Sequence, residues 1–205
     1  MEEIYLHAQC FGGTSLNALI VYGTSFGATK GTAEEMARIL REEHYDIKLV
    51  NAQEEKIKDI SAYQLVIVGS SLANCRWNSH AEDFLKRFQK DFDHTALALF
   101  VSSVNPIAKR EGNTEEMAKL HKIALEDKIT KYNLKPIMIG VFGGILNYNK
   151  MGFIARKGME IAFKTRLQTT GFQEVEPGVY DLRDWDEIRS WTRDLVKLCA
   201  RKNSE

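Results

Sequence analysis

The 205-residue chain contains few of the residues that mark special structural classes. It has only 3 prolines and 14 glycines, which excludes collagen-like and low-complexity chains. Its 3 cysteines, Cys10, Cys75 and Cys199, are odd in number and show neither a CxxC pair nor a Cys/His zinc spacing. We therefore expect neither a disulfide scaffold nor a structural zinc site. This cysteine usage is typical of a reducing compartment, so we expect a cytoplasmic protein.

An excess of one charge sign and long apolar runs are also missing. Lysine plus arginine and aspartate plus glutamate number 28 each, so net charge gives no indication of a nucleic-acid partner. No window approaches 18 uncharged apolar residues, and no transmembrane segment is predicted. The acidic start of the chain lacks the features of a signal peptide. The length suffices for one domain with a full core, and oligomeric state is left open.

Short apolar runs alternate with segments of helical periodicity along most of the chain. The runs, read as strands, are residues 17–22, 46–50, 64–70, 96–102 and 135–142. The helical segments are residues 29–43, 77–89, 113–132, 150–168 and 184–201. This alternation predicts an α/β fold, a five-stranded parallel sheet covered by helices on both faces in three layers. We expect one domain over residues 17–202, preceded by an N-terminal extension of residues 1–16.

The turn after the first strand has the composition of an anion-binding loop. Ligands of such sheets bind beyond the carboxyl ends of the strands. Backbone N–H groups at a helix start, together with hydroxyls, can cradle an anion, and Gly27 allows close approach of a phosphate. The loop has no lysine, and neither GxxxxGK[ST] nor GxGxxG occurs, so a monophosphate ester is favoured. A turn that merely caps a helix is the alternative. The candidate binding residues are Thr24, Ser25, Phe26, Gly27, Ala28 and Thr29.

Three further loops supply candidate contacts to a flat ring. Backbone amides after the third strand can line its polar edge, and Trp77 either covers the ring or packs at a helix start. Tyr148 either borders the site or lies on the surface, and Cys75 is expected to be a small buried thiol. The remaining candidates in these loops are Ser70, Ser71, Leu72, Ala73, Asn74, Ser103, Val104, Asn105, Gly143 and Gly144.

The first loop resembles a known family. Its pattern Thr24-x-x-Gly27-x-Thr29 is similar to the FMN-phosphate loop of flavodoxins, [TS]-x-[TS]-G-x-T, with Phe26 in place of the middle hydroxyl. The resemblance implies strand order 2-1-3-4-5 and FMN as cofactor. It extends to the flavodoxin branch that includes menaquinone-dependent protoporphyrinogen dehydrogenases. The segments that resemble this branch are residues 66–72 with Trp77, 100–105, 141–148 and 184–185.

The resemblance implies an FMN-dependent oxidoreductase in which the flavin supplies the chemistry, with no catalytic side chain and no metal. Electrons would pass between a reduced donor and a quinone or a redox partner protein. The branch often has Arg-Tyr where this chain has Ala73-Asn74, so substrate identity is not carried over. A flavodoxin-type electron shuttle is one alternative, although such shuttles are usually strongly acidic and this chain is neutral. A cofactor-free regulatory domain is the other, and Phe26 supports it.

The predicted helix over residues 150–168 is basic and amphipathic. Its basic residues outnumber the acidic Glu160 by five to one and are Lys150, Arg156, Lys157, Lys164 and Arg166. Such a helix can lie on an anionic membrane, here the inner face, or dock a partner. An ordinary helix packed on the sheet with a solvated basic face is the other interpretation.

Overall fold

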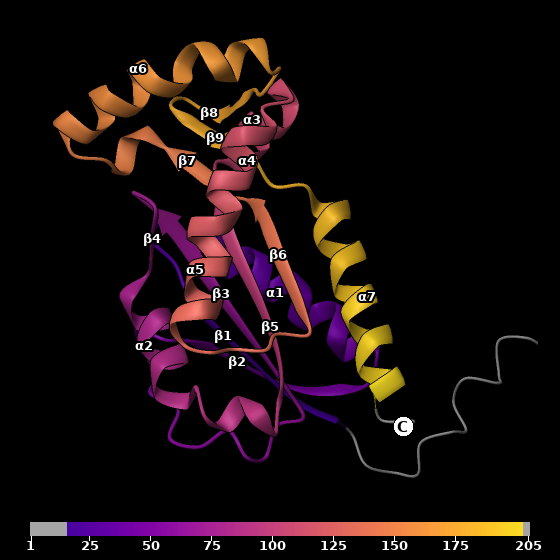
Figure 1. Ribbon diagram of the computed structural model, residues 1–205. Helices are drawn as coiled ribbons and strands as arrows, with labels where there is room; N and C mark the ends of the chain where they lie inside the picture. The colour runs from indigo at the N-terminus through magenta and orange to yellow at the C-terminus, as the bar shows by residue number, and fades with distance from the viewer. Residues whose placement is uncertain (1–15, 203–205) are drawn as a thin grey trace, which may run out of the picture.

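The computed structural model describes residues 16–202 (Figure 1). The expected N-terminal extension therefore lies, apart from Leu16, outside the described residues. The strands are β1 (Leu16–Gly23), β2 (Tyr45–Asn51), β3 (Leu65–Ala73), β4 (Arg76–Trp77), β5 (Ala96–Ser103), β6 (Met138–Gly143), β7 (Ile145–Asn147), β8 (Glu174–Glu176) and β9 (Val179–Asp181). The helices are α1 (Ala28–Glu42), α2 (Ser79–Phe88), α3 (Asn105–Glu111), α4 (Thr114–His121), α5 (Asp127–Lys131), α6 (Phe153–Thr169) and α7 (Trp185–Lys202). Short turns are the 3-10 segments η1 (Asp91–Asp93) and η3 (Tyr148–Lys150) and the π segment η2 (Lys122–Glu126).

The main sheet has the order β2-β1-β3-β5-β6, and these five strands are parallel. This confirms the predicted fold class and the strand order 2-1-3-4-5. The register places Ile20 beside Ile67 and Ile67 beside Ala98, in the middle of the sheet. Because all five strands run the same way, their carboxyl ends lie along one edge.

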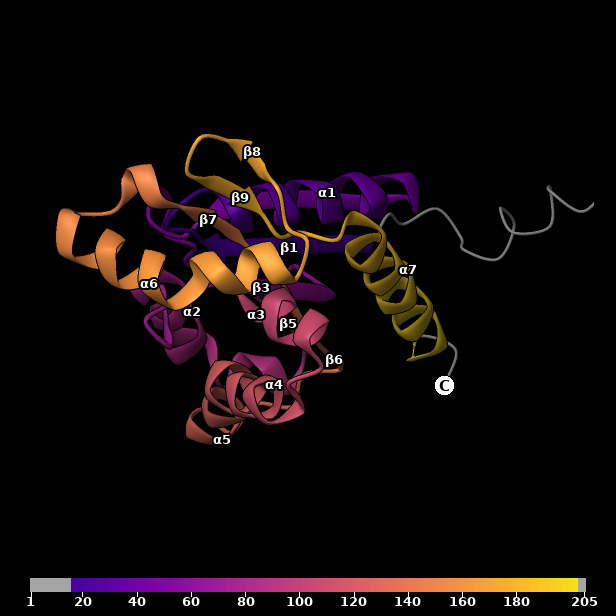
Figure 2. The ribbon, with the colours of Figure 1, turned by 90° about the horizontal axis from the view of Figure 1, so that it is seen from above.

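Apolar cores cover both faces of this sheet. On one face Ile20, Ile67 and Phe100 pack against α1 and α7. On the other, Leu19 and Val66 pack against α2 and the segment from η2 to α5. Figure 2 shows these helices on opposite sides of the strands. Successive side chains of a strand point to opposite faces, so burial of both faces explains the nearly continuous apolar runs.

The helix expected over residues 150–168 does not pack on the main sheet. The helix that covers the sheet beside β6 is α7. After β6 the chain forms a small sheet of order β7-β9-β8, on which α6 packs. Leu146, Leu167 and Tyr180 belong to the satellite core between them. Sequence periodicity missed these strands because three residues are too few to show alternation. Figure 1 shows α6 and this sheet beyond the carboxyl ends of the main strands.

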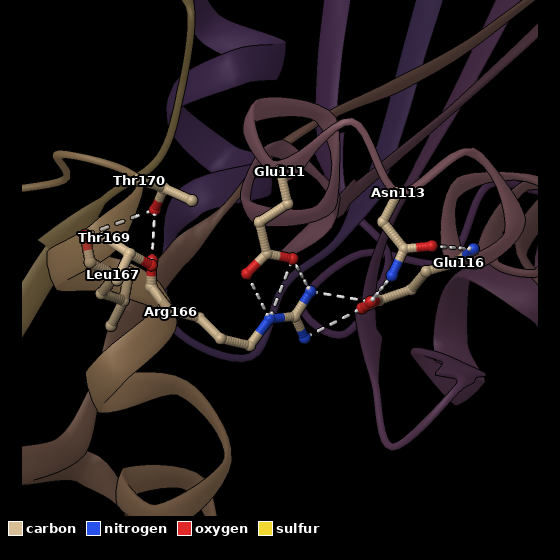
Figure 3. Close-up of polar contacts among 7 residues, drawn as sticks. All are labelled: Glu111, Asn113, Glu116, Arg166, Leu167, Thr169 and Thr170. Carbon is tan, nitrogen blue, oxygen red and sulfur yellow. Dashed lines mark hydrogen bonds and ion pairs between the residues drawn. The ribbon is translucent and has the colours of Figure 1, made fainter.

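An ion-pair cluster ties α6 to the main body (Figure 3). The Arg166 guanidinium donates to the carboxylate of Glu111 at 2.5 and 2.8 Å and to that of Glu116 at 2.7 Å. These hydrogen bonds raise the pKa of Arg166 and lower that of Glu111. Asn113 caps α4 and also donates to Glu116, at 3.2 Å. Since Glu111 and Glu116 belong to α3 and α4, the C-terminal half of α6 is held by electrostatic contacts as well as by Leu167.

None of the helices in the described part of the chain combines the length and apolarity needed to span a bilayer.

Replacing Gly69 by alanine is expected to destabilise the fold. A Cβ atom there would lie 2.1 Å from Cζ of Phe100, whose ring is fully buried. Overpacking of this kind costs about 1–3 kcal/mol, measurable as a lower urea midpoint. Gly158→Ala is the matched control, because its Cβ would meet nothing within 4 Å and alanine favours a helix. A Gly69→Ala variant as stable as the wild type would contradict this account of the core.

The Glu35 carboxylate gives the fold a pH-dependent contribution. Hydrogen bonds from Arg38, and then from Arg189 of α7, lower its pKa from 4.5 to about 2. Because the folded pKa lies below the unfolded one, this stabilisation is complete above pH 4.5 and is lost as the pH falls towards 2. We expect Glu35→Gln to lower the free energy of unfolding at pH 7, with the difference from wild type shrinking through pH 4 and 3. An equal difference at pH 7 and pH 2.5 would refute this.

Candidate functional site

Four of the predicted loops meet at the carboxyl edge of the main sheet. The register brings Gly23 beside Ser70, Ser71 beside Ser102, and Ser103 beside Gly143. Small and hydroxylated residues therefore line the edge across four neighbouring strands. The loop after β1 lies near the centre, because β1 and β3 stand where the strand order reverses.

The loop between β1 and α1 is a tight turn that leaves the start of α1 open. Gly27 has φ 92°, a left-handed conformation that glycine adopts without strain. Its N–H donates to Oγ1 of Thr24 at 2.9 Å, so Thr24 holds the turn together. Gly27 is the N-cap residue of α1. Among the described residues, no side chain accepts a hydrogen bond from the N–H groups that follow Gly27 at this helix start, and the first turn contains no acidic residue. The positive end of the helix dipole is thus available to an anion.

Thr29, the second residue of α1, has a buried hydroxyl without a partner. Its Oγ1 is fully buried and forms no hydrogen bond within the described chain, and the same holds for Thr32 one turn later. A buried hydroxyl without a hydrogen bond carries a desolvation cost. A Cβ atom at Gly27 would meet no described atom within 4 Å, so the turn is not filled from within. These features fit the phosphate of a monoester, as the sequence predicts.

The predicted loop after the third strand is a hairpin. Leu72 and Ala73 pair antiparallel with Trp77 and Arg76 of β4. Asn74 and Cys75 between them have φ 50° and 58°, the two positive values of a type I′ turn. Ala73, Asn74 and Cys75 are exposed near the hairpin tip, so the expectation that Cys75 is buried was wrong.

The hairpin base contacts the first loop, where the hydroxyls of Ser71 and Ser25 lie 3.0 Å apart. Ser25 is exposed, Ser71 and Phe26 are half-buried, and Ala28 is buried. These residues therefore lie where a ligand held by the α1 start would extend towards β3.

The side chains of Ser70 and Trp77 form hydrogen bonds to backbone groups of the fold at this edge. The Ser70 hydroxyl donates to the carbonyl of Ser71 at 3.0 Å and accepts from the N–H of Asn78 at 2.9 Å. Trp77 is 5% exposed, packs in the core, and donates its indole N–H to the Ala124 carbonyl at 2.5 Å. The structure thus places Trp77 in the packing role rather than over an open ring.

The end of β5 and the start of α3 contain two further unpartnered polar atoms among the described residues. Ser103 Oγ accepts from the N–H of Asn105 at 3.1 Å. Within the described chain, Ser102 Oγ and Asn105 Oδ1 are buried without a hydrogen bond. Val104 is half-buried against the satellite core. Sequence reasoning missed Ser102, although a pair of serines ending a buried strand was the signal available.

Gly143 packs against the segment after β9, Gly144 against the end of β5, and Tyr148 against the small sheet. A Cβ at Gly143 would lie 1.9 Å from the Leu182 carbonyl oxygen, and the Gly144 N–H donates to the Ser103 carbonyl at 2.7 Å. Tyr148 is buried rather than a surface residue, and its ring meets that of Tyr180 edge to face. Burial, more than any charge, raises the Tyr148 pKa to about 12, and its hydroxyl has no partner among the described residues.

The sheet order and this edge define a doubly wound α/β protein in which the loop after the first strand leaves the start of a helix uncapped by any described side chain. The family model described as "Flavodoxin domain" matches residues 19–171. The chain therefore belongs to the flavodoxin domain family. No curated protein matches the sequence significantly.

Solved structures are similar in fold at low sequence identity. A short-chain flavodoxin associated with a non-canonical PDU bacterial microcompartment is 12% identical, with TM-score 0.52 and 90% of this chain and 99% of that one covered. FMN-bound Fusobacterium nucleatum flavodoxin is 15% identical, with TM-score 0.46 and coverage of 88% and 97%. Rubredoxin:oxygen oxidoreductase of Desulfovibrio gigas is 15% identical, with TM-score 0.43 and coverage of 76% and 36%, so this chain spans about a third of that protein.

Proposed function

We propose that this protein binds FMN and acts as an oxidoreductase, passing electrons between a reduced donor and a quinone or protein acceptor. The observation that carries the proposal is the open start of α1, where the buried Thr29 hydroxyl lacks a partner. Membership of the flavodoxin family supports FMN as the ester that fills it.

The chain's own residues would bind and orient the cofactor. The Thr29 hydroxyl and the first amides of α1 would hold the phosphate, with Thr24 keeping the turn in shape. Groups of Ser71 and Asn105 would lie along the ring, where Asn105 Oδ1 has an unused acceptor. When bound, the flavin supplies hydride and single-electron transfer. The candidate residues include no carboxylate or imidazole, so we assign the protein no acid–base step.

Thr29→Val is expected to weaken FMN binding by about ten- to a hundred-fold, because it removes one charge-assisted hydrogen bond. Fluorescence titration of the flavin measures this. Thr32→Val is the matched control, since it removes the same kind of buried, unpartnered hydroxyl from the same helix. It should leave the dissociation constant unchanged.

Both valine variants should unfold at urea midpoints equal to or above that of the free wild type, because neither loses a hydrogen bond in the free protein. Equal affinity of Thr29→Val and wild type would move the phosphate elsewhere. Wild-type protein that shows no flavin absorbance and takes up no FMN would support the cofactor-free regulatory domain instead.

The acceptor class is tested with reduced, FMN-loaded protein in a stopped-flow instrument. We expect a soluble naphthoquinone to reoxidise the flavin faster than a one-electron protein acceptor such as cytochrome c, because the chain is neutral and lacks the acidic charge that steers shuttles to basic partners. Faster reoxidation by the protein acceptor, with a strong decrease in rate as salt rises, would favour the electron shuttle.

A further inference from the structure

Helix α6 carries apolar side chains on two opposite sides. On the inner side Met159, Phe163 and Leu167 pack into the satellite core. On the outer side the exposed fractions are 77% for Phe153, 86% for Ile154 and 83% for Ile161. A helix on a protein surface normally buries one apolar stripe and presents a polar one to water. The second stripe therefore requires an explanation other than packing within this chain.

Cations on α6 are divided between the same two sides. Arg156 pairs with Glu160 at 2.7 Å, and Arg166 is held by Glu111 and Glu116. Within the described residues, Lys157 and Lys164 form no ion pair within 4 Å, although their positive charges help to lower the pKa of Glu160, whose direct partner is Arg156. At 3.6 residues per turn, positions 154, 157, 161 and 164 lie on one face. Exposed isoleucines thus alternate with unpaired lysines along that face.

We propose that this outer face of α6, made by Phe153, Ile154, Lys157, Ile161 and Lys164, docks on an anionic lipid bilayer. Apolar side chains beside lysines are the composition of a helix that lies in a membrane interface, where the lysine stems stretch to the headgroups. Each lysine near an anionic surface also adds electrostatic attraction. Lys150, just before α6, is exposed as well and adds a third cation.

A second copy of the chain fits this surface less well than lipid. An isologous contact between two α6 helices would gather Lys157 and Lys164 of both copies in one interface, where the like charges repel. The bilayer instead supplies negative charge to the lysines and an apolar phase to the isoleucines together. Charge complementarity thus selects the lipid surface.

The position of α6 connects this surface to the proposed function, on which this step rests. Figures 1 and 2 show α6 beyond the carboxyl ends of the strands, over the edge that carries the candidate site. Docking through α6 would bring that edge to the bilayer. Such an arrangement suits an acceptor that dissolves in lipid, such as a long-chain quinone.

Vesicle flotation with the full chain tests the proposal directly. We expect binding to vesicles of phosphatidylcholine with one-third phosphatidylglycerol, and at least ~10-fold weaker binding to pure phosphatidylcholine. Lys157→Glu/Lys164→Glu should reduce binding to anionic vesicles at least ~10-fold, as should Ile154→Ser/Ile161→Ser. The matched controls are Lys58→Glu/Lys90→Glu and Leu198→Ser, at exposed positions away from α6, which should bind like the wild type.

The outcomes separate this proposal from the proposed function, because flotation is measured on both FMN-free and FMN-loaded protein. No flotation at low salt in either form, or equal flotation of wild type and both α6 variants, overturns membrane docking and leaves FMN binding untouched. A concentration-dependent dimer that the isoleucine variant abolishes, without vesicle binding, would assign the face to a second copy. Vesicle binding by a protein that takes up no FMN would refute only the redox function.

Discussion

Burial of the parallel sheet on both faces is the constraint on which the rest of the structure depends. Because β1, β3 and β5 have an apolar core on each side, their middle positions must be apolar or small, as at Gly69 under the Phe100 ring. Polar side chains are admitted only where the strands end. Parallel direction brings all those ends to one edge, so serine and threonine collect there, some of them buried and unpartnered.

That edge is shared between scaffold and candidate site. Hydrogen bonds to backbone groups of neighbouring segments are formed by Ser70 and Trp77, and backbone of other segments lies close against Gly143 and Gly144. In contrast, Thr29 and Asn105 each have a buried polar atom without a hydrogen bond among the described residues. Residue type did not separate these two groups, since serine and glycine occur in the scaffold as readily as in the loops. What separates them is whether another segment of the chain already supplies the hydrogen-bond partner.

The small sheet with α6 adds a second packing unit beyond the carboxyl ends of the main strands. It is held by the satellite core and by the ion pairs of Arg166 with Glu111 and Glu116. The apolar side chains on the inner side of α6 are therefore packed, and its Arg166 is paired. This leaves the outer side with Ile154, Ile161 and unpaired lysines. The same helix can therefore be fixed to the protein and remain available to a surface of complementary chemistry.

The sequence by itself determined the α/β class, the main strands and the first loop, because continuous apolar runs and a small hydroxylated turn are local signals. Strand order and FMN came from resemblance to flavodoxins rather than from periodicity. Only the tertiary structure decided that α7 covers the sheet while α6 stands on a second one, since three-residue strands such as β8 leave no pattern. It also decided that Trp77 and Tyr148 are buried and that Cys75 is exposed, because burial depends on which distant segment folds against a side chain.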